Sequence, residues 1–590
     1  MIRLFAFMPR IAIVHKEKCN PQGCGGYLCI RLCPVNRGGK ECIGIDTDKK
    51  IKIDEKLCTG CGICPNRCPF GAIDIINLPE QLEHPIHRYG RNGFHLYNLP
   101  VPMFGKVVGI LGVNGIGKST AIKILAGALK PNLGTDNEVD FDVLIKYFKG
   151  SEAQIFFEKL KKGEIKISYK PQQVDLLPKS VKGKVIDLLK KVDEKKQLDE
   201  VIEVLDLKNV LSTDISQISG GELQRVAIAA TVLKKANVYI FDEPTSFLDI
   251  KQRIKVANFI KSLANENTAV MVVEHDLLVI DTMSDLIHLM YGKSASYGVV
   301  SFAKNARVGI NTYLDGFIRD ENMRFRDHAI KFSPRPPPSV QKTAQITSWT
   351  DLKKKLGSFL LEAKEGVLHK SLTVGVLGEN GIGKTTFVKL LAKVLSPDSG
   401  EISKSLRVSY KPQHLSTESD ALVMSVLHDA IQNYELQLIR PLQLKDLLLK
   451  PMNTLSGGEL QRVSIAHCLS QPADLYLLDE PSAYLDVEQR LIVSKVLREI
   501  AEQRGTTLLV VDHDLMFIDY LAEKIIVFEG TPAKHGCVTG PFAMEEGMNH
   551  FLSHLNITMR RDKESLRPKI NKPDSRLDRE QKEEGKLYYS

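Results

Sequence analysis

Long apolar runs are missing from this sequence of 590 residues. Segments such as VVGILG, YIFDEP and LLVVD have the length of a buried strand, and none approaches the roughly 18 consecutive apolar residues of a membrane helix. A large excess of one charge is also missing, since the formal net charge is only +9. The sequence therefore predicts no membrane span, and the sign of its charge favours a polyanionic partner.

The composition is otherwise ordinary for a globular protein. Apolar residues make up 43% and charged residues 26% of the chain, which excludes wholesale disorder and a fibrous class. At roughly 100 to 200 residues per domain, the length predicts three or four domains. The amino-terminal stretch MIRLFAFMPRIAIVHKEK lacks a small-residue cleavage site, so we expect it to be retained, with Met8 as an alternative start.

Cysteine is almost absent outside one short region, because nine of the eleven cysteines lie from Cys19 to Cys68. Without a credible signal peptide, a secreted disulfide framework is disfavoured. One set of four reads C-x2-C-x2-C-x3-C-P, which is the ligand run of bacterial 4Fe-4S ferredoxins, and a looser set reads C-x4-C-x4-C-x3-C-P. Zinc is the alternative, although zinc ribbons usually pair two CxxC knuckles across a long spacer.

The two cysteine sets predict two 4Fe-4S clusters that share ligands, because the fourth cysteine of such a run ligates the other cluster. The predicted ligands are Cys19, Cys24, Cys29 and Cys68 for one cluster and Cys33, Cys58, Cys61 and Cys64 for the other. We interpret Cys42, Cys468 and Cys537 as small buried apolar residues.

The rest of the chain is an internal repeat that carries two phosphate-binding loops. GVNGIGKST and GENGIGKTT each follow an apolar strand and open an amphipathic helix, the context that supports a P-loop. The backbone and side chains of such a loop hold nucleotide phosphates, with the lysine at the terminal phosphates and the first hydroxyl on Mg2+. The predicted ATP and Mg2+ ligands are Gly112, Asn114, Gly115, Gly117, Lys118, Ser119 and Thr120 in the first copy and Gly378, Asn380, Gly381, Gly383, Lys384, Thr385 and Thr386 in the second.

Each copy continues with an apolar strand that ends in two carboxylates, in VYIFDEP and LYLLDEP. The aspartates, Asp242 and Asp479, are placed to bind magnesium, and the glutamates, Glu243 and Glu480, are placed to polarise the attacking water. Two such pairs in the same order relative to the P-loops predict two nucleotide-hydrolysing units.

Between these elements stand ISGGELQR and LSGGELQR, by which the chain resembles the ATP-binding cassette superfamily. The resemblance implies Gln172 and Gln413 as Q-loop residues, His275 and His513 as switch histidines, and Asp249 and Asp486 as the ends of D-loops. It also implies that the two cassettes meet head to tail, so that each P-loop faces the signature turn of the other cassette. The signature residues are Ser219, Gly220 and Gly221 in the first cassette and Ser456, Gly457 and Gly458 in the second.

The two copies differ in length. Lys118 and Ser219 are 101 positions apart, whereas Lys384 and Ser456 are 72 apart, and the surplus falls in a stretch with helical periodicity interrupted by KG. This stretch predicts a helix-turn-helix insertion at about 136–165, as either a surface decoration or a docking element.

Two further segments lack a counterpart in a minimal cassette. SPRPPPS at 333–339 predicts a stiff extended connector, and the carboxyl-terminal stretch echoes residues 309–327 like a second copy of one hinge. Its basic residues are either a solvated face or an extended arm on a polyanion, and they comprise Arg560, Arg561, Lys563, Arg567, Lys569 and Lys572.

Taken together, the CxxxCP pairs, INLPEQLEHPIHRYGRNGF, NGIGKST, SGGELQR, EPSAYLDVEQR and RPKINK resemble the E-subfamily ABC proteins, the iron-sulfur ribosome-recycling ATPases of archaea and eukaryotes. The resemblance implies an ATPase that splits ribosomes after termination or stalling, with the iron-sulfur domain as a lever and a link to initiation through the small subunit. It implies partners in the ribosome and its rRNA, a termination or Pelota-type factor and initiation factors, and a cytoplasmic monomer with an intramolecular cassette pair.

The resemblance also suggests adenine-stacking aromatics, namely Tyr89 and Phe94 in the first cassette and either Trp349 or Phe359 in the second. Two departures from the family pattern are Thr245 in TSFLD and Asp512 in place of glutamate before the second switch histidine. A redox-regulated ATPase or an RNase inhibitor without splitting activity is the alternative function, although no flavin, haem or nicotinamide motif accompanies the clusters.

The expected fold class is α/β, with two tandem P-loop ABC domains head to tail after a small α+β ferredoxin-like domain. The expected boundaries are 1–78 for the ferredoxin-like domain, 79–300 and 346–530 for the cassettes, 301–345 for the hinge and linker, and 531–590 for the basic carboxyl-terminal hinge.

Overall fold

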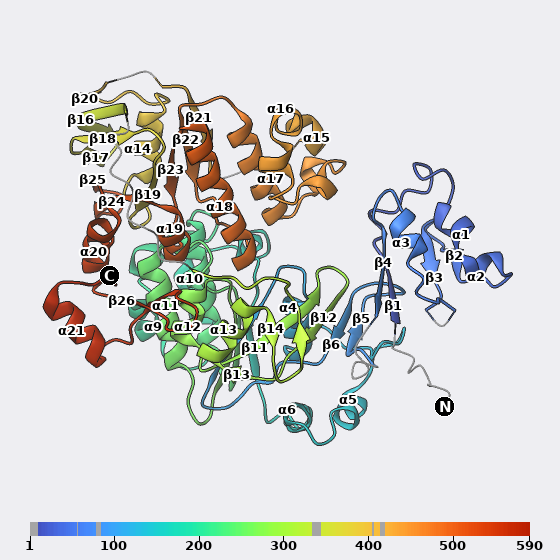
Figure 1. The fold of residues 1–590 in the computed structure, drawn as a ribbon. Coiled ribbons are helices and arrows are strands. Elements are labelled where there is room, and N and C mark those ends of the chain that lie inside the picture. The colour runs from blue at the N-terminus through green and yellow to red at the C-terminus, as the bar shows by residue number, and fades with distance from the viewer. Residues whose placement is uncertain are drawn as a thin grey trace.

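The computed structural model describes residues 10–55, 57–77, 84–332, 344–403, 406–413 and 419–589. The alternative start at Met8 and the predicted connector at 333–339 lie outside the described residues. The fold consists of a small amino-terminal domain and two large α/β domains, which lie against each other (Figure 1).

The amino-terminal domain is built from two short antiparallel strand pairs and three short helices. β1 (Arg10–Val14) pairs with β4 (Ile73–Asn77), and β2 (Ile43–Ile45) pairs with β3 (Ile51–Ile53). The helices α1 (Leu28–Leu32), α2 (Pro34–Arg37) and α3 (Ile63–Arg67) each follow or precede cysteines of the predicted ligand sets. Because the strands are this short, cysteines make up much of the buried core of this domain.

The first cassette has a mixed sheet in the order β5-β6-β12-β11-β7-β10-β9-β8, with β13 paired to β11. Its central strands are parallel and fully buried, which fits the continuous apolar runs of its sequence. The strands are β5 (His87–Arg88), β6 (His95–Tyr97), β7 (Val107–Gly112), β8 (Ile167–Lys170), β9 (Val238–Asp242), β10 (Ala269–Val273), β11 (Leu286–Lys293), β12 (Tyr297–Val300) and β13 (Lys304–Asn305). The helices are α4 (Lys118–Leu125), α5 (Phe141–Tyr147), α6 (Glu152–Lys161), α7 (Leu177–Ser180), α8 (Val185–Val192), α9 (Leu198–Val204), α10 (Gly220–Val232), α11 (Ile250–Ser262) and α12 (Leu277–Met283).

The second cassette repeats this plan in the sheet order β18-β16-β17-β25-β24-β19-β23-β22-β21, with β20 paired to β16. The strands are β16 (Gln345–Leu356), β17 (Phe359–Ala363), β18 (Gly366–His369), β19 (Thr373–Leu377), β20 (Ser399–Ile402), β21 (Val408–Lys411), β22 (Leu475–Asp479), β23 (Thr507–Val511), β24 (Lys524–Thr531) and β25 (His535–Ala543). The helices are α14 (Lys384–Leu391), α15 (Val423–Val426), α16 (His428–Asn433), α17 (Gly457–Ser470), α18 (Val487–Arg504) and α19 (Leu515–Leu521). The predicted fold class is therefore confirmed.

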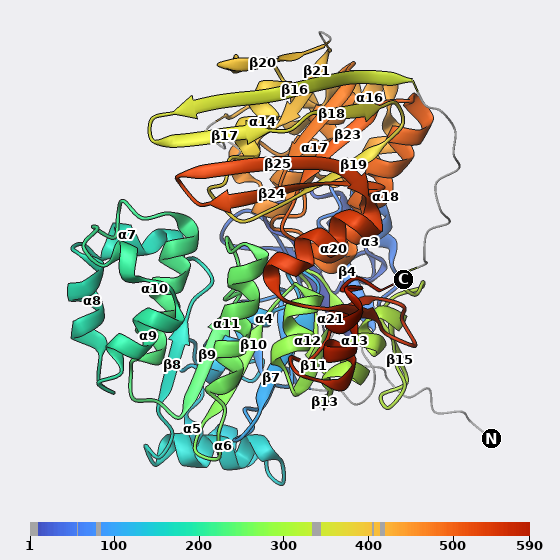
Figure 2. The same cartoon turned by 90° about the vertical axis from the view of Figure 1, so that its left-hand side faces the viewer.

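The helices α5 and α6 fall within the stretch where the sequence predicts an inserted helix pair. They project from the edge of the first cassette (Figure 2). Their inward faces bury Leu144 and Phe157, whereas Phe141, Val143 and Ile155 are exposed. The buried side chains of the insertion therefore join the apolar core of the first cassette, and the pair also presents apolar side chains at the surface.

Each cassette is followed by a helix and a two-stranded antiparallel hairpin. After the first these are α13 (Ala306–Asp315), β14 (Phe317–Ile318) and β15 (Met323–Arg324), and after the second α20 (Met544–Leu555), β26 (Met559–Arg561) and β27 (Pro568–Ile570), then α21 (Arg576–Glu584). The two hinge segments touch, because Arg307 Nε donates to Asp562 Oδ2 at 3.1 Å. Among the described residues, no helix has the length and apolar content needed to cross a bilayer.

Candidate functional site

The two P-loops directly follow the central strands β7 and β19, at the carboxyl ends of these strands. Gly117 and Gly383, just before the helices, have φ values of 95° and 93°, a conformation that favours glycine. Lys118 Nζ donates to the carbonyls of Gly112 and Val113, both at 2.8 Å. Burial lowers the pKa of Lys118 to about 8, against the opposing effect of nearby carboxylates. A phosphate bound at this lysine would raise the pKa of Lys118 again, because a nearby negative charge favours the ammonium form.

The predicted water-activating groups meet beside each P-loop. Gln172 Nε2 donates to Glu243 Oε1 at 2.7 Å, and His275 Nε2 lies 3.4 Å from the same oxygen. In the second cassette, Gln413 Nε2 donates to Glu480 Oε1 at 2.6 Å. His513 Nε2 lies 3.6 Å from that oxygen, so the arrangement is the same in both copies.

The polar atoms at the strand ends show whether the predicted magnesium ligands fit this ion. In the second cassette, Thr385 Oγ1 donates to Asp479 Oδ2 at 2.9 Å. In the first, burial raises the pKa of Asp242 to about 6, although a hydrogen bond from Ser119 acts to lower it. Among the described residues, Asp242 Oδ2 is buried without a hydrogen-bond partner. A hydroxyl and an orphaned carboxylate oxygen at the phosphate loop are the ligands that Mg2+ takes, so the residues fit this ion.

A lysine and a glutamine in each cassette hold the backbone carbonyls of the strand-end carboxylate residues, and motif spacing did not predict these contacts. Lys170 Nζ donates to the carbonyls of Asp242 and Glu243 at 2.9 and 3.1 Å, and Gln224 Nε2 donates to Glu243 O at 2.6 Å. Lys411 and Gln461 repeat these bonds in the second cassette. The lysine of each KPQ and the glutamine of each SGGELQR occupy these places, so their recurrence in both copies was the available signal.

The two carboxylate sites differ in their electrostatics. Burial raises the pKa of Glu243, but the contact and charge of His275 outweigh it and bring the pKa down to about 2. Burial also raises the pKa of Glu480, and there Asp512 adds to the increase. Burial holds the pKa of His513 well below its usual range, so this imidazole is neutral and does not oppose the shift. Glu480 is therefore the more basic of the two carboxylates.

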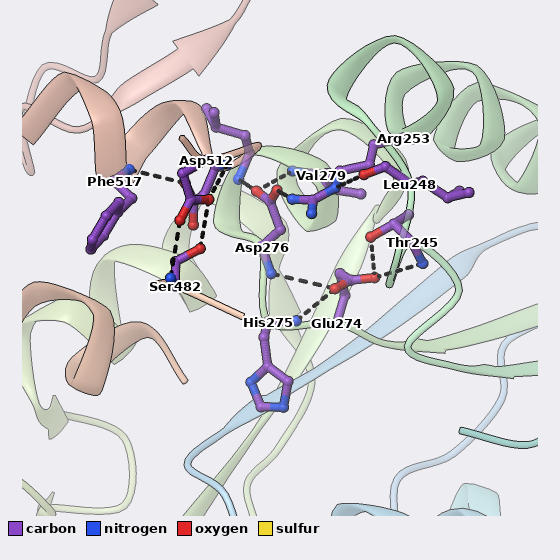
Figure 3. A network of polar contacts seen from close by, with 12 residues as sticks. Thr245, Leu248, Arg253, Glu274, His275, Asp276, Val279, Ser482, Asp512 and Phe517 are labelled. Carbon is purple, nitrogen blue, oxygen red and sulfur yellow. Dashed lines mark hydrogen bonds and ion pairs between the residues drawn. The ribbon is translucent and has the colours of Figure 1, made fainter. Parts of the chain in front are cut away.

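Each of the two departures from the family pattern belongs to a hydrogen-bonded pair of a hydroxyl and a carboxylate, and the two pairs occupy equivalent places in the two cassettes. Thr245 Oγ1 donates to Glu274 Oε2 at 2.7 Å, and Ser482 Oγ donates to Asp512 Oδ1 at 2.7 Å (Figure 3). Both carboxylates thus anchor the hydroxyl that follows a strand-end carboxylate pair. The aspartate is shorter than the glutamate by one methylene and performs the same anchoring.

The cassettes contact each other through reciprocal hydrogen bonds. Asn114 N in the first P-loop donates to Asp486 Oδ2 at 3.2 Å, and Asn380 N in the second donates to Asp249 Oδ2 at 3.1 Å. Asp249 and Asp486 are also the N-caps of α11 and α18. Each P-loop is therefore bonded to the start of a helix in the opposite cassette.

Each signature turn lies against a residue of its own cassette that contacts the opposite P-loop. Tyr484 O accepts from Asn114 Nδ2 at 3.3 Å, and a Cβ on Gly458 would stand 2.9 Å from that same carbonyl oxygen. In the other direction, Phe247 O accepts from Asn380 Nδ2 at 3.4 Å and crowds Gly221 in the same way. Ser219 and Ser456 open α10 and α17 with complete capping boxes, so both signature turns are rigid helix starts.

Aromatic rings stand beside both P-loops. Phe94 lies so close to Gly117 that an added Cβ would meet its ring at 2.6 Å, and Tyr89 Oη lies 3.3 Å from Thr120 Oγ1. Phe359 stands against Gly383 in the equivalent place. Trp349 is only 1% exposed and donates its Nε1 to Lys364 O, so the suggestion that it stacks on the second adenine is wrong.

The cysteines gather into two groups, as the spacing predicts. One group lines an apolar pocket, formed with Tyr27, Ile51 and Phe70 around Cys19, Cys24, Cys29 and Cys68. Burial raises the pKa of Cys29 to about 11, and the nearby thiols of Cys19 and Cys68 contribute to this increase. In the other group, burial and then Cys58 and Cys61 raise the pKa of Cys64 to about 12. Four convergent thiols in an apolar pocket fit a 4Fe-4S cluster.

Cys42 is buried, as predicted, but it is not isolated. Burial raises the pKa of Cys42 to about 12, and the nearby thiols of Cys33 and Cys58 contribute to the increase. Its Sγ lies 3.8 Å from the carbonyl oxygen of Asp54. It therefore packs against two predicted ligands of the second cluster, which the sequence spacing did not indicate.

The basic carboxyl-terminal stretch is not an extended arm, and three of its cations, Arg561, Arg567 and Lys569, are already paired with aspartates within the chain. Arg567 is fully buried, and its Nη1 lies 3.1 Å from Asp281 Oδ2, which Lys569 Nζ approaches to 3.0 Å. Arg561 lies over the ring of Tyr589. The cations left exposed are Arg560, Lys563 and Lys572.

Family models match three parts of the chain. The ABC transporter model matches residues 102–246 and 364–483, a model described as a possible Fer4-like domain in RNase L inhibitor matches 9–41, and a 4Fe-4S binding domain model matches 51–74. The matched segments contain both P-loops and all eight predicted cluster ligands.

Several relatives match this chain over almost its whole length. An uncharacterized ABC transporter ATP-binding protein of Methanocaldococcus jannaschii is 52% identical, covering 98% of this chain and 97% of its own. Translation initiation factor RLI1 of Saccharomyces cerevisiae is 46% identical, covering 98% of each chain. A structure of ribosome-bound archaeal Pelota and ABCE1 superposes with a TM-score of 0.94 at 52% identity, covering 98% of this chain and 99% of that one.

These similarities agree with the paired P-loops, the strand-end carboxylates and the grouped cysteines. The predicted cofactors, two 4Fe-4S clusters, ATP and Mg2+, are those of the matched family. The chain therefore belongs to the E subfamily of the ABC proteins, whose members are ATPases with an amino-terminal iron-sulfur domain.

Proposed function

We propose that this chain is an ATP-driven ribosome-recycling factor, in which cassette closure moves the iron-sulfur domain against the ribosome. The proposal rests on the attachment of that domain to the first cassette. Asp74 Oδ1 accepts from Lys293 Nζ at 2.6 Å, and Asn92, itself buried, donates to Ala12 O and accepts from Ile53 N. A domain fixed in this way moves with the cassette that carries it.

Two composite ATP sites would drive the movement. Lys118 and Lys384 would hold the terminal phosphates, Ser119 and Thr385 with Asp242 and Asp479 would hold Mg2+, and the opposite signature turn would complete each site. Mg2+, when bound, neutralises charge on the phosphates. Glu243 and Glu480 would orient and deprotonate the attacking water, held in place by Gln172, Gln413, His275 and His513.

The proposed partners follow from the relatives. One structural relative is bound to the ribosome with Pelota, and another, at 51% identity and a TM-score of 0.81, is a complex of an archaeal recycling factor with the ribosomal stalk protein aP1. We infer a ribosome partner, a Pelota-type or termination factor, and initiation factors on the small subunit, all met in the cytoplasm. Exposed cations such as Arg560 and Lys563 are available for rRNA phosphates.

The domain boundaries belong to the same proposal. Residues 1–78 would act as the moving domain, 79–300 and 346–530 as the ATP-driven cassettes, and 301–345 and 531–590 as the hinge segments between them. The exposed apolar residues of the inserted pair α5 and α6 would provide a further docking element.

The test is ribosome splitting on sucrose gradients, with the anaerobically reconstituted protein, a termination factor and ATP. Wild type should separate the subunits, whereas Cys61→Ser should hydrolyse ATP without splitting and Glu243→Gln/Glu480→Gln should bind ATP without turnover. Cys537→Ser, which changes a cysteine outside both groups, is the control and should split normally. Normal splitting by Cys61→Ser, or intact ribosomes with wild type, would refute the lever and favour a redox-regulated ATPase.

A further inference from the structure

Three metal-ligating side chains converge at a place that neither the ATP sites nor the clusters use. His550 and His554 lie one turn apart on α20, and Glu529 lies on β24 of the second cassette, against which α20 packs (Figure 1). The Nε2 atoms of His550 and His554 lie 2.8 and 3.1 Å from Glu529 Oε1. One ligand atom from each of the three residues falls within 4.8 Å of the others.

The three groups are not satisfied by hydrogen bonds to one another. Although both nitrogens are close to Glu529 Oε1, this buried oxygen has no partner with hydrogen-bond geometry among the described residues. The two imidazole rings cross at 77° with centroids 5.3 Å apart, so they are not stacked.

We propose that Glu529, His550 and His554 form a binding site for a divalent transition-metal ion, with Zn2+ as the preferred ion. Two imidazole nitrogens and a carboxylate oxygen are a donor set that suits zinc, with water in the fourth position. Metal–ligand bonds of about 2.0 to 2.1 Å in a tetrahedron hold ligand atoms about 3.3 Å apart, so the two distances between histidine nitrogens and Glu529 Oε1 need to widen by only a few tenths of an ångström.

The site has solvent access and a structural consequence. The side chain of His554 is 46% exposed, which gives an ion a route to the three ligands. The same helix buries Met548, Phe551 and Leu552 in the core. A bound ion would therefore join the carboxyl-terminal hinge helix to the sheet of the second cassette, in addition to this apolar packing.

One sulfur donor lies on the same face of the sheet. Cys537 is directly opposite Glu529 in the register of β24 and β25, but it is not among the residues whose ligand atoms converge. The site that we propose has nitrogen and oxygen ligands only. This choice separates it from zinc that replaces iron at the thiolate clusters, which would show sulfur ligands.

The experiment uses the full, untagged chain with its iron-sulfur clusters reconstituted, and Zn2+ alone as the probe. Isothermal titration calorimetry should show one zinc per chain, and His550→Gln/His554→Gln should weaken that binding by at least about 100-fold, since loss of outer-shell partners alone costs 10- to 100-fold. Glu529→Gln should also weaken it. His428→Gln, at an exposed histidine elsewhere, and Cys537→Ser should bind zinc as wild type does.

Zinc K-edge X-ray absorption gives a readout that does not depend on activity. The proposal predicts a shell of nitrogen and oxygen at about 2.0 to 2.1 Å and none at the sulfur distance of about 2.3 Å. Unchanged iron content in each variant shows that the clusters and the fold are intact. Equal zinc binding by wild type and the double-histidine variant, or a sulfur shell in wild type, would overturn the site and leave the three residues as an ion pair only.

Discussion

Asp486 accepts hydrogen bonds from both cassettes, so a substitution at this residue can test how much the bond between cassettes contributes to their closure. Its Oδ1 accepts from Gln489 N at 2.9 Å and caps α18, while its Oδ2 accepts from Asn114 N in the opposite P-loop at 3.2 Å. Asp486→Asn keeps one side-chain oxygen, which can still cap α18. Its amide nitrogen would face the Asn114 N–H, and two donors form no hydrogen bond. Since a hydrogen bond to a charged group contributes about 1.5 to 3 kcal/mol, we expect closure to weaken by about 10- to 150-fold.

Closure can be read from ATP binding when hydrolysis is blocked. In a Glu243→Gln/Glu480→Gln background, the apparent ATP affinity measured by equilibrium dialysis should fall in proportion to the closed population. Thermal unfolding without nucleotide separates the two roles of Asp486, because loss of the helix cap would lower the melting temperature. We expect an unchanged melting temperature.

Asp193→Asn is the matched control, because Asp193 accepts from the backbone amides of Gln197 and Leu198 within its own cassette. It should leave ATP affinity unchanged. Asp249→Asn should reproduce the Asp486→Asn result at the other site, since Asp249 accepts from the second P-loop in the same way. An affinity change below about threefold in both interface variants would refute the closure role of these bonds.

Three further predictions follow from buried charges. Asp281→Asn leaves the fully buried Arg567 without its anion and should destabilise the docked carboxyl-terminal hinge by about 3 to 5 kcal/mol, seen as faster hydrogen exchange there; unchanged exchange would contradict this. Asp74→Asn should increase hydrogen exchange at β1 and β4 and should reduce ribosome splitting more than ATP hydrolysis. Contacts with His15 and Lys293 hold the pKa of Asp74 well below its usual range, so acidification of the wild type should increase this exchange only at low pH. Despite burial, contacts with His275 bring the pKa of Glu243 down to about 2, whereas burial raises the pKa of Glu480. In Glu243→Gln only the second site works, so its ATPase activity should be lost at a higher pH on acidification than that of Glu480→Gln, where only the first site works. Superimposable acid limbs in the two pH profiles would contradict this assignment.

Local motifs carried most of what the sequence could predict. The P-loops, the strand-end carboxylates and the grouped cysteines are contiguous patterns whose spacing alone limits their geometry, and the predicted fold class is confirmed. The repeat was informative because each pattern recurs in the same order, so chance similarity was improbable.

What the sequence did not predict depends on burial and on contacts between distant segments. Lys170 and Lys411 lie at strand ends as many surface lysines do. Their recurrence in both KPQ segments marks them, but the fold is needed to show that they reach the last carbonyls of the neighbouring parallel strand. Arg567 belongs to a basic run that reads as solvated, yet Asp281, far away in the chain, neutralises it. Trp349 was a candidate for stacking by residue type alone, and its burial depends on how β16 packs.

The contact between the two hinge segments has a consequence for how the protein responds to dilution. Arg307 joins them through Asp562, and Arg326 Nε of the first segment reaches Glu488 of the second cassette at 3.2 Å. The two halves of each ATP site are thus held near each other by the chain itself, at an effective concentration that the hinge geometry sets. ATP-driven closure is then a first-order event, with the same equilibrium at nanomolar as at micromolar protein, unlike that of a cassette dimer assembled from separate chains.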